Sequence, residues 1–116
     1  MTELAKEIYR ELRRRVRAQQ GAITYRELAA AVAATTPIHH RNPKLYAALG
    51  EVSTACRSAD LPCLPAVVWS ASLKRPADGY YAVAHPRARS EKARVAAWER
   101  ERERVLLEAE RFPRTL

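Results

Sequence analysis

The sequence predicts a single small α+β domain that is mainly α-helical, and three observations lead to this class. The chain has 116 residues, enough for one hydrophobic core and too few for two independent ones. Four segments carry apolar residues at helical spacing, and only the region around residues 66–84 has strand composition. Apolar residues make up 47% of the chain and charged residues 29%, which excludes disorder, collagen-like repeats and a disulfide-rich miniprotein.

The first helix is predicted over residues 3–19, where apolar residues recur every four positions on one face. This stripe consists of Leu4, Ile8, Leu12 and Val16. Gly21 follows the segment and is expected to close the helix. Arg13, Arg14 and Arg17 lie mostly off the stripe, where they either form a solvated face that complements the helix dipole or extend a basic binding surface.

A second helix is predicted over residues 24–34 because Thr24 and Glu27 have the spacing of a capping box. Pro37 ends this segment, since the residue before a proline is pushed out of the helical region. A third helix is predicted over residues 43–59, with Asn42 as its N-cap and a proline at its first position. Its buried stripe is expected to be Leu45, Leu49, Val52 and Cys56.

Two β-strands forming a hairpin are predicted after the third helix. Residues 66–71 are rich in β-branched and aromatic side chains, and residues 80–84 form the second candidate strand. Between them, residues 74–79 contain a proline and an Asp-Gly pair, which are typical of turns. The hairpin would carry Lys74 and Arg75 at its tip.

A long, highly charged helix is predicted over residues 90–111, with Ser90 as its cap. Its apolar stripe consists of Trp98, Val105, Ala109 and Phe112. Such a stripe either packs on the domain or pairs two copies of the chain as a homodimer.

Three helices followed by a β-hairpin is the element order of a winged helix-turn-helix domain. We expect this domain to span residues 1–88 and the C-terminal helix to occupy residues 89–116. In such a domain the third helix meets the nucleic acid with its N-terminal residues, and the hairpin contacts the phosphate backbone.

The charge balance favours a polyanionic partner. Lys and Arg number 21 against 13 Asp and Glu, giving a net charge of +8, and neutralising phosphates releases counterions. Duplex DNA is the expected ligand, and RNA is an alternative. The predicted contact residues are Arg41, Lys44, Thr54 and Arg57 on or before the third helix, Lys74 and Arg75 on the hairpin, and Arg13, Arg14 and Arg17 as an extension.

Residues 23–29, Ile-Thr-Tyr-Arg-Glu-Leu-Ala, resemble the Thr-Tyr-Gly-Glu-(Ile/Leu)-Ala segment of alkylguanine-DNA alkyltransferases and alkyltransferase-like proteins. Further similarity lies at Asn42-Pro43-Lys44, Ala48-Leu49-Gly50, Val67-Val68 and Gly79-Tyr80, so that the resemblance covers roughly residues 23–81. It implies a winged helix-turn-helix that holds DNA through the minor groove.

The same comparison implies that the family's enzyme chemistry is missing. The family's catalytic motif is Pro-Cys-His-Arg, whereas here Cys63 is followed by Leu64 and Pro65. The family's arginine finger, which replaces a flipped base in the stack, corresponds to Ala47. A thiol needs a nearby base or positive field to react, so we expect no catalytic residue.

No metal site or other cofactor is expected, because His39, His40, Cys56 and Cys63 lack the spacing of zinc ligands. Two cysteines are too few for a disulfide framework and are expected to be reduced. No apolar run approaches the roughly 20 residues of a membrane span, and the N-terminus lacks the pattern of a secretory signal. The sequence therefore predicts a cytoplasmic protein without a membrane partner.

A second function class is compatible with the same features. The domain would then be a small protein-binding accessory, inhibitor or antitoxin-like module that acts on a nucleic-acid-handling protein. Its basic surface would contact an acidic face of that partner. The two classes differ in whether the chain binds nucleic acid at low salt.

Overall fold

The structure, a computed structural model, describes residues 1–116 and is mainly α-helical, with five α-helices and one two-stranded sheet. The helices are α1 (Glu3–Arg17), α2 (Tyr25–Val32), α3 (Pro43–Ser58), α4 (Asp78–Ala84) and α5 (Glu91–Leu107). The strands are β1 (Ile23–Thr24) and β2 (Val68–Trp69), and two short 3₁₀ helices are η1 (Leu64–Val67) and η2 (Ala109–Arg111). No helix is both long enough and apolar enough to cross a membrane.

The helix starts lie where the capping residues predict them. Thr24 Oγ1 accepts a hydrogen bond from the Glu27 amide at 3.1 Å, and the Glu27 carboxylate accepts one from the Thr24 amide at 2.9 Å, which confirms the capping box. Asn42 accepts from the Lys44 amide at the start of α3, and Ser90 caps α5 in the same way. These local bonds satisfy backbone donors that a helix leaves free at its first turn.

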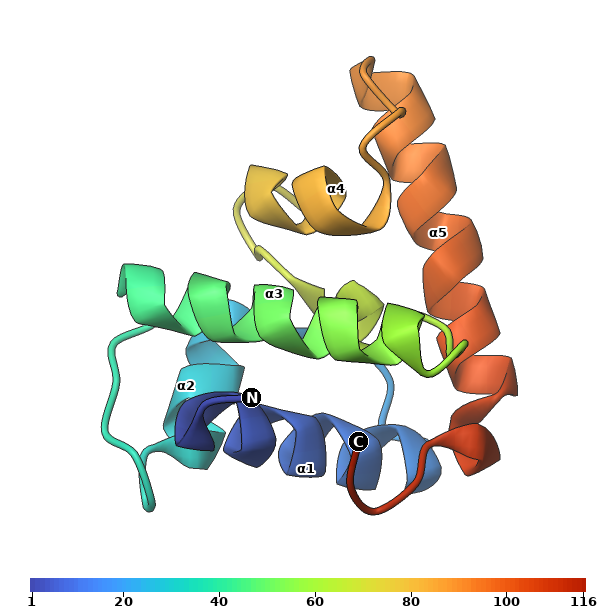
Figure 1. The fold of residues 1–116 in the computed structure, drawn as a ribbon. Coiled ribbons are helices and arrows are strands. Elements are labelled where there is room, and N and C mark those ends of the chain that lie inside the picture. The colour runs from blue at the N-terminus through green and yellow to red at the C-terminus, as the bar shows by residue number, and fades with distance from the viewer.

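A single hydrophobic core of 24 buried residues joins all parts of the chain. α3 lies between α1 and α4, and α5 runs along one side of the molecule past the end of α3 (Figure 1). The predicted stripes of α3 and of the C-terminal segment are buried, and on α1 three of the four stripe residues are. Trp98 of α5 donates its indole N–H to the Ala66 carbonyl of η1 at 2.8 Å, so this helix packs on the domain.

The predicted hairpin of residues 66–71 and 80–84 is wrong. Only Val68–Trp69 form a strand in that region, and they pair in parallel with Ile23–Thr24 rather than with residues 80–84. Residues 80–84 belong to α4, where Tyr81 is buried. Ala82 and Ala84 follow the two tyrosines and favour a helix, and the burial of Tyr81 in α4 adds to this, so a weak strand preference is overridden.

A tight turn takes the place of the predicted hairpin. Ser70 and Arg75 form an isolated antiparallel bridge, in which the Ser70 amide donates to the Arg75 carbonyl at 2.9 Å. We call residues 70–75 the bridged turn. It leads directly into α4 and lies beside the N-terminal end of α2, because β2 pairs with β1.

Gly21 does not close the first helix as predicted. α1 ends at Arg17, and Gln19 and Gly21 both have positive φ values, 58° and 73°. Arg15 then holds the loop to the helix, because its guanidinium donates to the carbonyls of Gly21 at 3.2 Å and Ala22 at 3.1 Å. The glycine therefore bends the chain toward β1 rather than ending α1.

Candidate nucleic-acid interface

A surface cleft of about 500 Å³ opens between the start of α2, the loop before α3, the first turn of α3 and the bridged turn. We call it the basic cleft. Its polar and charged lining residues are Thr24, Arg26, His40, Arg41, Ser70 and Ser72, and its less polar ones are Tyr25, Tyr46, Ala71, Leu73 and Ala77. The β1–β2 pairing brings the bridged turn to this position, although it follows α2 by almost 40 residues along the chain.

The cations of the basic cleft have no acidic partner. Arg26 and Arg41 are exposed and take part in none of the ion pairs of the chain, and neither side chain donates a hydrogen bond. Three arginines of α1 pair with glutamates, and on α5 Arg94 pairs with Asp78 and Arg104 with two glutamates. The basic cleft therefore carries unpaired positive charge and has no carboxylate among its lining residues.

The His40 imidazole responds to this positive surrounding. Its ring stacks on His39 with centroids 4.2 Å apart. Loss of water around the ring, together with the neighbouring His39, Arg26 and Arg41, lowers the pKa of His40. An anion entering the cleft would offset that repulsion.

Three of the predicted contact residues flank the cleft or lie on the exposed face of α3. Lys44 in the first turn of α3 is exposed, and its ammonium group has no partner within the chain. Lys74 is exposed on the bridged turn. Thr54 is exposed two to three turns further along α3 from Lys44. Together with Arg41, these residues are free to contact a ligand.

Arg57 and Arg75 have different roles from the predicted ones. Arg57 donates to the carbonyls of Val83 at 2.6 Å and Ala84 at 3.3 Å, so it caps the C-terminal end of α4. Arg75 forms ion pairs with Glu91 and Asp78, and only 15% of its side chain is exposed. Both arginines thus form contacts within the chain, and of the two only Arg57 is exposed.

The α1 arginines are also engaged within the chain. Arg13 donates to the Phe112 carbonyl at 2.9 Å, and Arg17 pairs with Glu110. Arg14 pairs with Glu11 one turn away on α1, which raises the pKa of the guanidinium further. Arg13 and Arg17 thus fix the C-terminal segment against α1, and Arg14 belongs to a surface ion pair of small energetic value.

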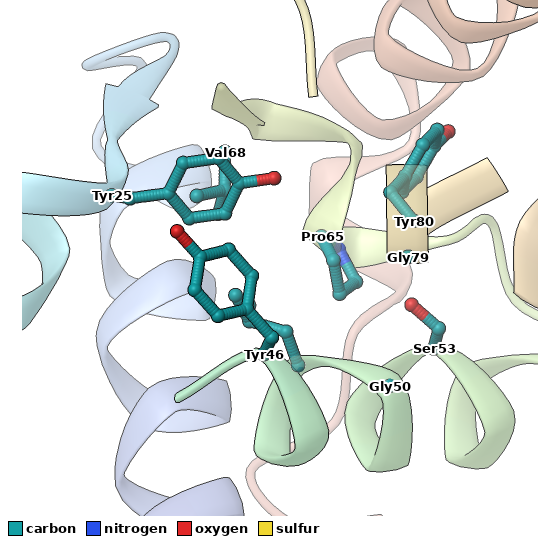
Figure 2. Close-up of a pocket in the computed structure, with 9 residues that line it drawn as sticks. Tyr25, Tyr46, Gly50, Ser53, Pro65, Val68, Gly79 and Tyr80 are labelled. Atoms are coloured by element: carbon teal, nitrogen blue, oxygen red, sulfur yellow. The ribbon is translucent and has the colours of Figure 1, made fainter. Parts of the chain in front are cut away.

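The floor of the basic cleft is a pair of tyrosines. The rings of Tyr25 and Tyr46 lie 5.0 Å apart, and Figure 2 shows them facing one another. Behind them is a cavity of about 30 Å³ that Gly50, Pro65 and other residues line, enough for a water molecule rather than for a drug-sized ligand. The buried Tyr25 hydroxyl accepts from the Ala77 amide at 2.9 Å, and burial raises its pKa to about 12.

A second pocket, of about 270 Å³, surrounds Cys63 on another part of the molecule, and we call it the Cys63 pocket. The Cys63 thiol lies 3.1 Å from the Ser53 hydroxyl, and the Cys63 amide donates to Glu101 at 2.7 Å. Burial raises the pKa of this thiol to about 12. His85 pairs with the Tyr80 hydroxyl at 2.8 Å. The polar groups in and around the Cys63 pocket are therefore largely satisfied by one another.

Two residues at positions that matter in the family comparison, Ala47 and Leu64, have no reactive or charged side chain. Ala47 is exposed on α3 and brings no cation to the surface. Leu64, which follows Cys63 where the family's motif has a histidine, is fully buried in η1. No three His, Cys, Asp or Glu side chains are grouped so that they could hold a metal ion.

Arg26 and His40 were not among the predicted contact residues. For Arg26 a signal exists in the sequence, because it lies within the Thr24–Glu27 capping box and so is on the first turn of a short helix, on the face opposite Leu28. His40 has no such signal, since its place in the cleft depends on the path of the loop between α2 and α3.

Comparison of the chain with protein-family models, with curated proteins and with solved structures finds no match.

Proposed function

We propose that this protein is a non-catalytic nucleic-acid-binding protein that holds duplex DNA against the basic cleft. The observation that carries the proposal is the convergence of Arg26, His40 and Arg41 on one cleft without a carboxylate partner. A polyanion neutralises such cations together and gains free energy from released counterions.

The order and placement of the elements support duplex DNA. α2 and α3 follow one another along the chain, and the bridged turn lines the same cleft. We interpret α2 and α3 as a helix-turn-helix and the bridged turn as its reduced wing. Lys44 on α3 and Lys74 on the bridged turn have free ammonium groups. The resemblance of residues 23–81 to the DNA-binding domain of the alkyltransferase family favours the same ligand.

The absence of a catalytic role is part of the proposal. Cys63 is the nucleophile nearest to the family's catalytic position, and a thiol with a pKa of about 12 is almost entirely protonated at neutral pH. Its sulfur contacts the Ser53 hydroxyl, which is not a base at that pH.

Fluorescence anisotropy tests the proposal with labelled random duplex DNA, single-stranded DNA and duplex RNA at low and moderate salt. We expect the duplex DNA to bind most tightly, with an affinity that falls steeply as salt rises. Tighter binding of RNA would change the ligand class. No binding of any nucleic acid at low salt would overturn the proposal and favour an acidic protein partner, which a pull-down from the native host would then seek.

A further inference from the structure

A large apolar side chain stands on the rim of the basic cleft without any cover from the chain. Leu73 lines the cleft and is 53% exposed. Three other leucines, Leu106, Leu107 and Leu116, are also exposed, and a single exposed leucine is ordinary on a protein surface. This one differs because its neighbours across the cleft are the free cations Arg26 and Arg41.

The backbone holds Leu73 in place. The Lys74 amide donates to the Ser70 carbonyl at 2.7 Å, and the Leu73 amide donates to the Ser70 hydroxyl at 3.2 Å. The same hydroxyl lies 3.1 Å from that of Ser72. Arg75 anchors the base of the turn to Glu91 of α5. These bonds restrain the turn that carries Leu73, which lowers the ordering entropy lost when the side chain meets a ligand.

The turn also carries a strained residue next to the leucine. Lys74 has a φ of 59°, in the left-handed region that glycine adopts without cost. A lysine there costs about 1–2 kcal/mol. The sequence thus places a cation at a position where the backbone favours glycine, directly beside an exposed apolar side chain.

These features fit a DNA-distorting contact. Proteins that bind the minor groove insert apolar side chains between base steps, while flanking cations hold the phosphates on either side. We infer that Leu73 is such a wedge: it enters the minor groove of bound duplex DNA and partly unstacks one base step. Lys74 and the cleft cations then hold the adjacent phosphates.

The inference rests on the proposed function and deepens it by naming the DNA that should be preferred. Pyrimidine–purine steps such as TA unstack easily, whereas A-tracts are stiff. A wedge therefore favours duplexes with a central TA step. We expect a preference of about threefold to tenfold over an A-tract of equal length.

The test uses the full chain with two duplexes, one with a central TA step beside 2-aminopurine and one with a central A-tract. We expect the wild type to raise the 2-aminopurine fluorescence on binding and to prefer the TA duplex. Leu73→Ala should lose both effects and keep its salt dependence. Leu107→Ala is the matched control, because Leu107 is 78% exposed on α5 and should change neither.

Leu73→Phe and Leu73→Ser show whether the unstacking needs an apolar side chain at this position or follows from any change in the turn. The phenylalanine variant should keep the fluorescence rise, and the serine variant should lose it. If Leu73→Ala binds, prefers and unstacks the TA duplex like the wild type, the wedge is overturned while the proposed function stands. If the wild type binds neither duplex, the proposed function itself fails.

Discussion

The basic cleft and the Cys63 pocket both contain arginine, histidine and serine, but only the pocket also contains carboxylates, and the two sites differ in how their polar groups are satisfied. In the cleft, Arg26 and Arg41 face solvent without partners. In the pocket, Cys63, Glu101 and Arg57 all hydrogen-bond within the chain. Polar groups that are already paired stabilise a fold, whereas unpaired cations are available to a ligand. We therefore place the function at the cleft and treat the pocket as structure.

Trp98→Ala gives the largest effect that this comparison predicts. The indole is 4% exposed and donates to the Ala66 carbonyl in the segment that follows Cys63. We expect a loss of about 3–5 kcal/mol in the free energy of unfolding, measured by chemical denaturation. Leu107→Ala, on the exposed face of α5, should stay within about 0.5 kcal/mol of the wild type. Equal losses in the two variants would contradict the packing of α5 on the domain.

The thiols should be inert in the folded protein. Burial raises the pKa of Cys56 to about 11 and that of Cys63 to about 12, and both side chains are buried. At pH 8 we expect a thiol-specific reagent such as Ellman's reagent to label the native protein at least about a hundredfold more slowly than the unfolded chain in guanidinium. Rapid labelling of Cys63 in the native state would show that the Cys63 pocket is a reactive site and would contradict its structural role.

DNA binding should strengthen modestly as the pH falls. His39, Arg26 and Arg41 add to the loss of water in lowering the pKa of His40 in the free protein. Bound phosphates offset these cations, so the pKa of His40 rises on binding and a proton is taken up. Affinity at constant ionic strength should therefore increase by roughly threefold from pH 7.5 to 5.5.

His40→Gln is the matched variant for this pH dependence. It keeps a polar side chain at the position and removes the titration, so its affinity should change less between the two pH values. An identical pH profile for the wild type and the variant would exclude His40 from the binding surface.

The sequence predicts four of the five helices because their signals are local, and it misses α4. Stripes and caps such as Asn42 and Ser90 act within one or two turns, and the structure confirms both caps. The strand partner could not be predicted in this way, because β2 pairs with β1 across more than 40 residues of chain. The prediction of a strand over residues 80–84 was wrong for a related reason, because the packing of Tyr81 in α4 outweighs its strand preference.

For the candidate site too, local features could be predicted from the sequence and long-range contacts could not. Lys44 and Lys74 are exposed, as expected for cations in a helix start and a turn. The partners of Arg57 and Arg75 lie 26 and 16 residues further along the chain, at Val83 and Glu91, and only the fold brings them together. Sequence spacing therefore identifies cations but not which of them remain free.

The most direct test of the account compares two double variants that each remove two positive charges. Arg26→Ala with Arg41→Ala removes the two unpaired arginines of the basic cleft. Arg14→Ala with Arg17→Ala removes two arginines of α1 that are paired within the chain. The slope of log affinity for duplex DNA against log salt should fall by about two for the cleft variant and stay unchanged for the α1 variant. Equal slopes for the two variants would show that binding follows net charge alone and would contradict the cleft as the site.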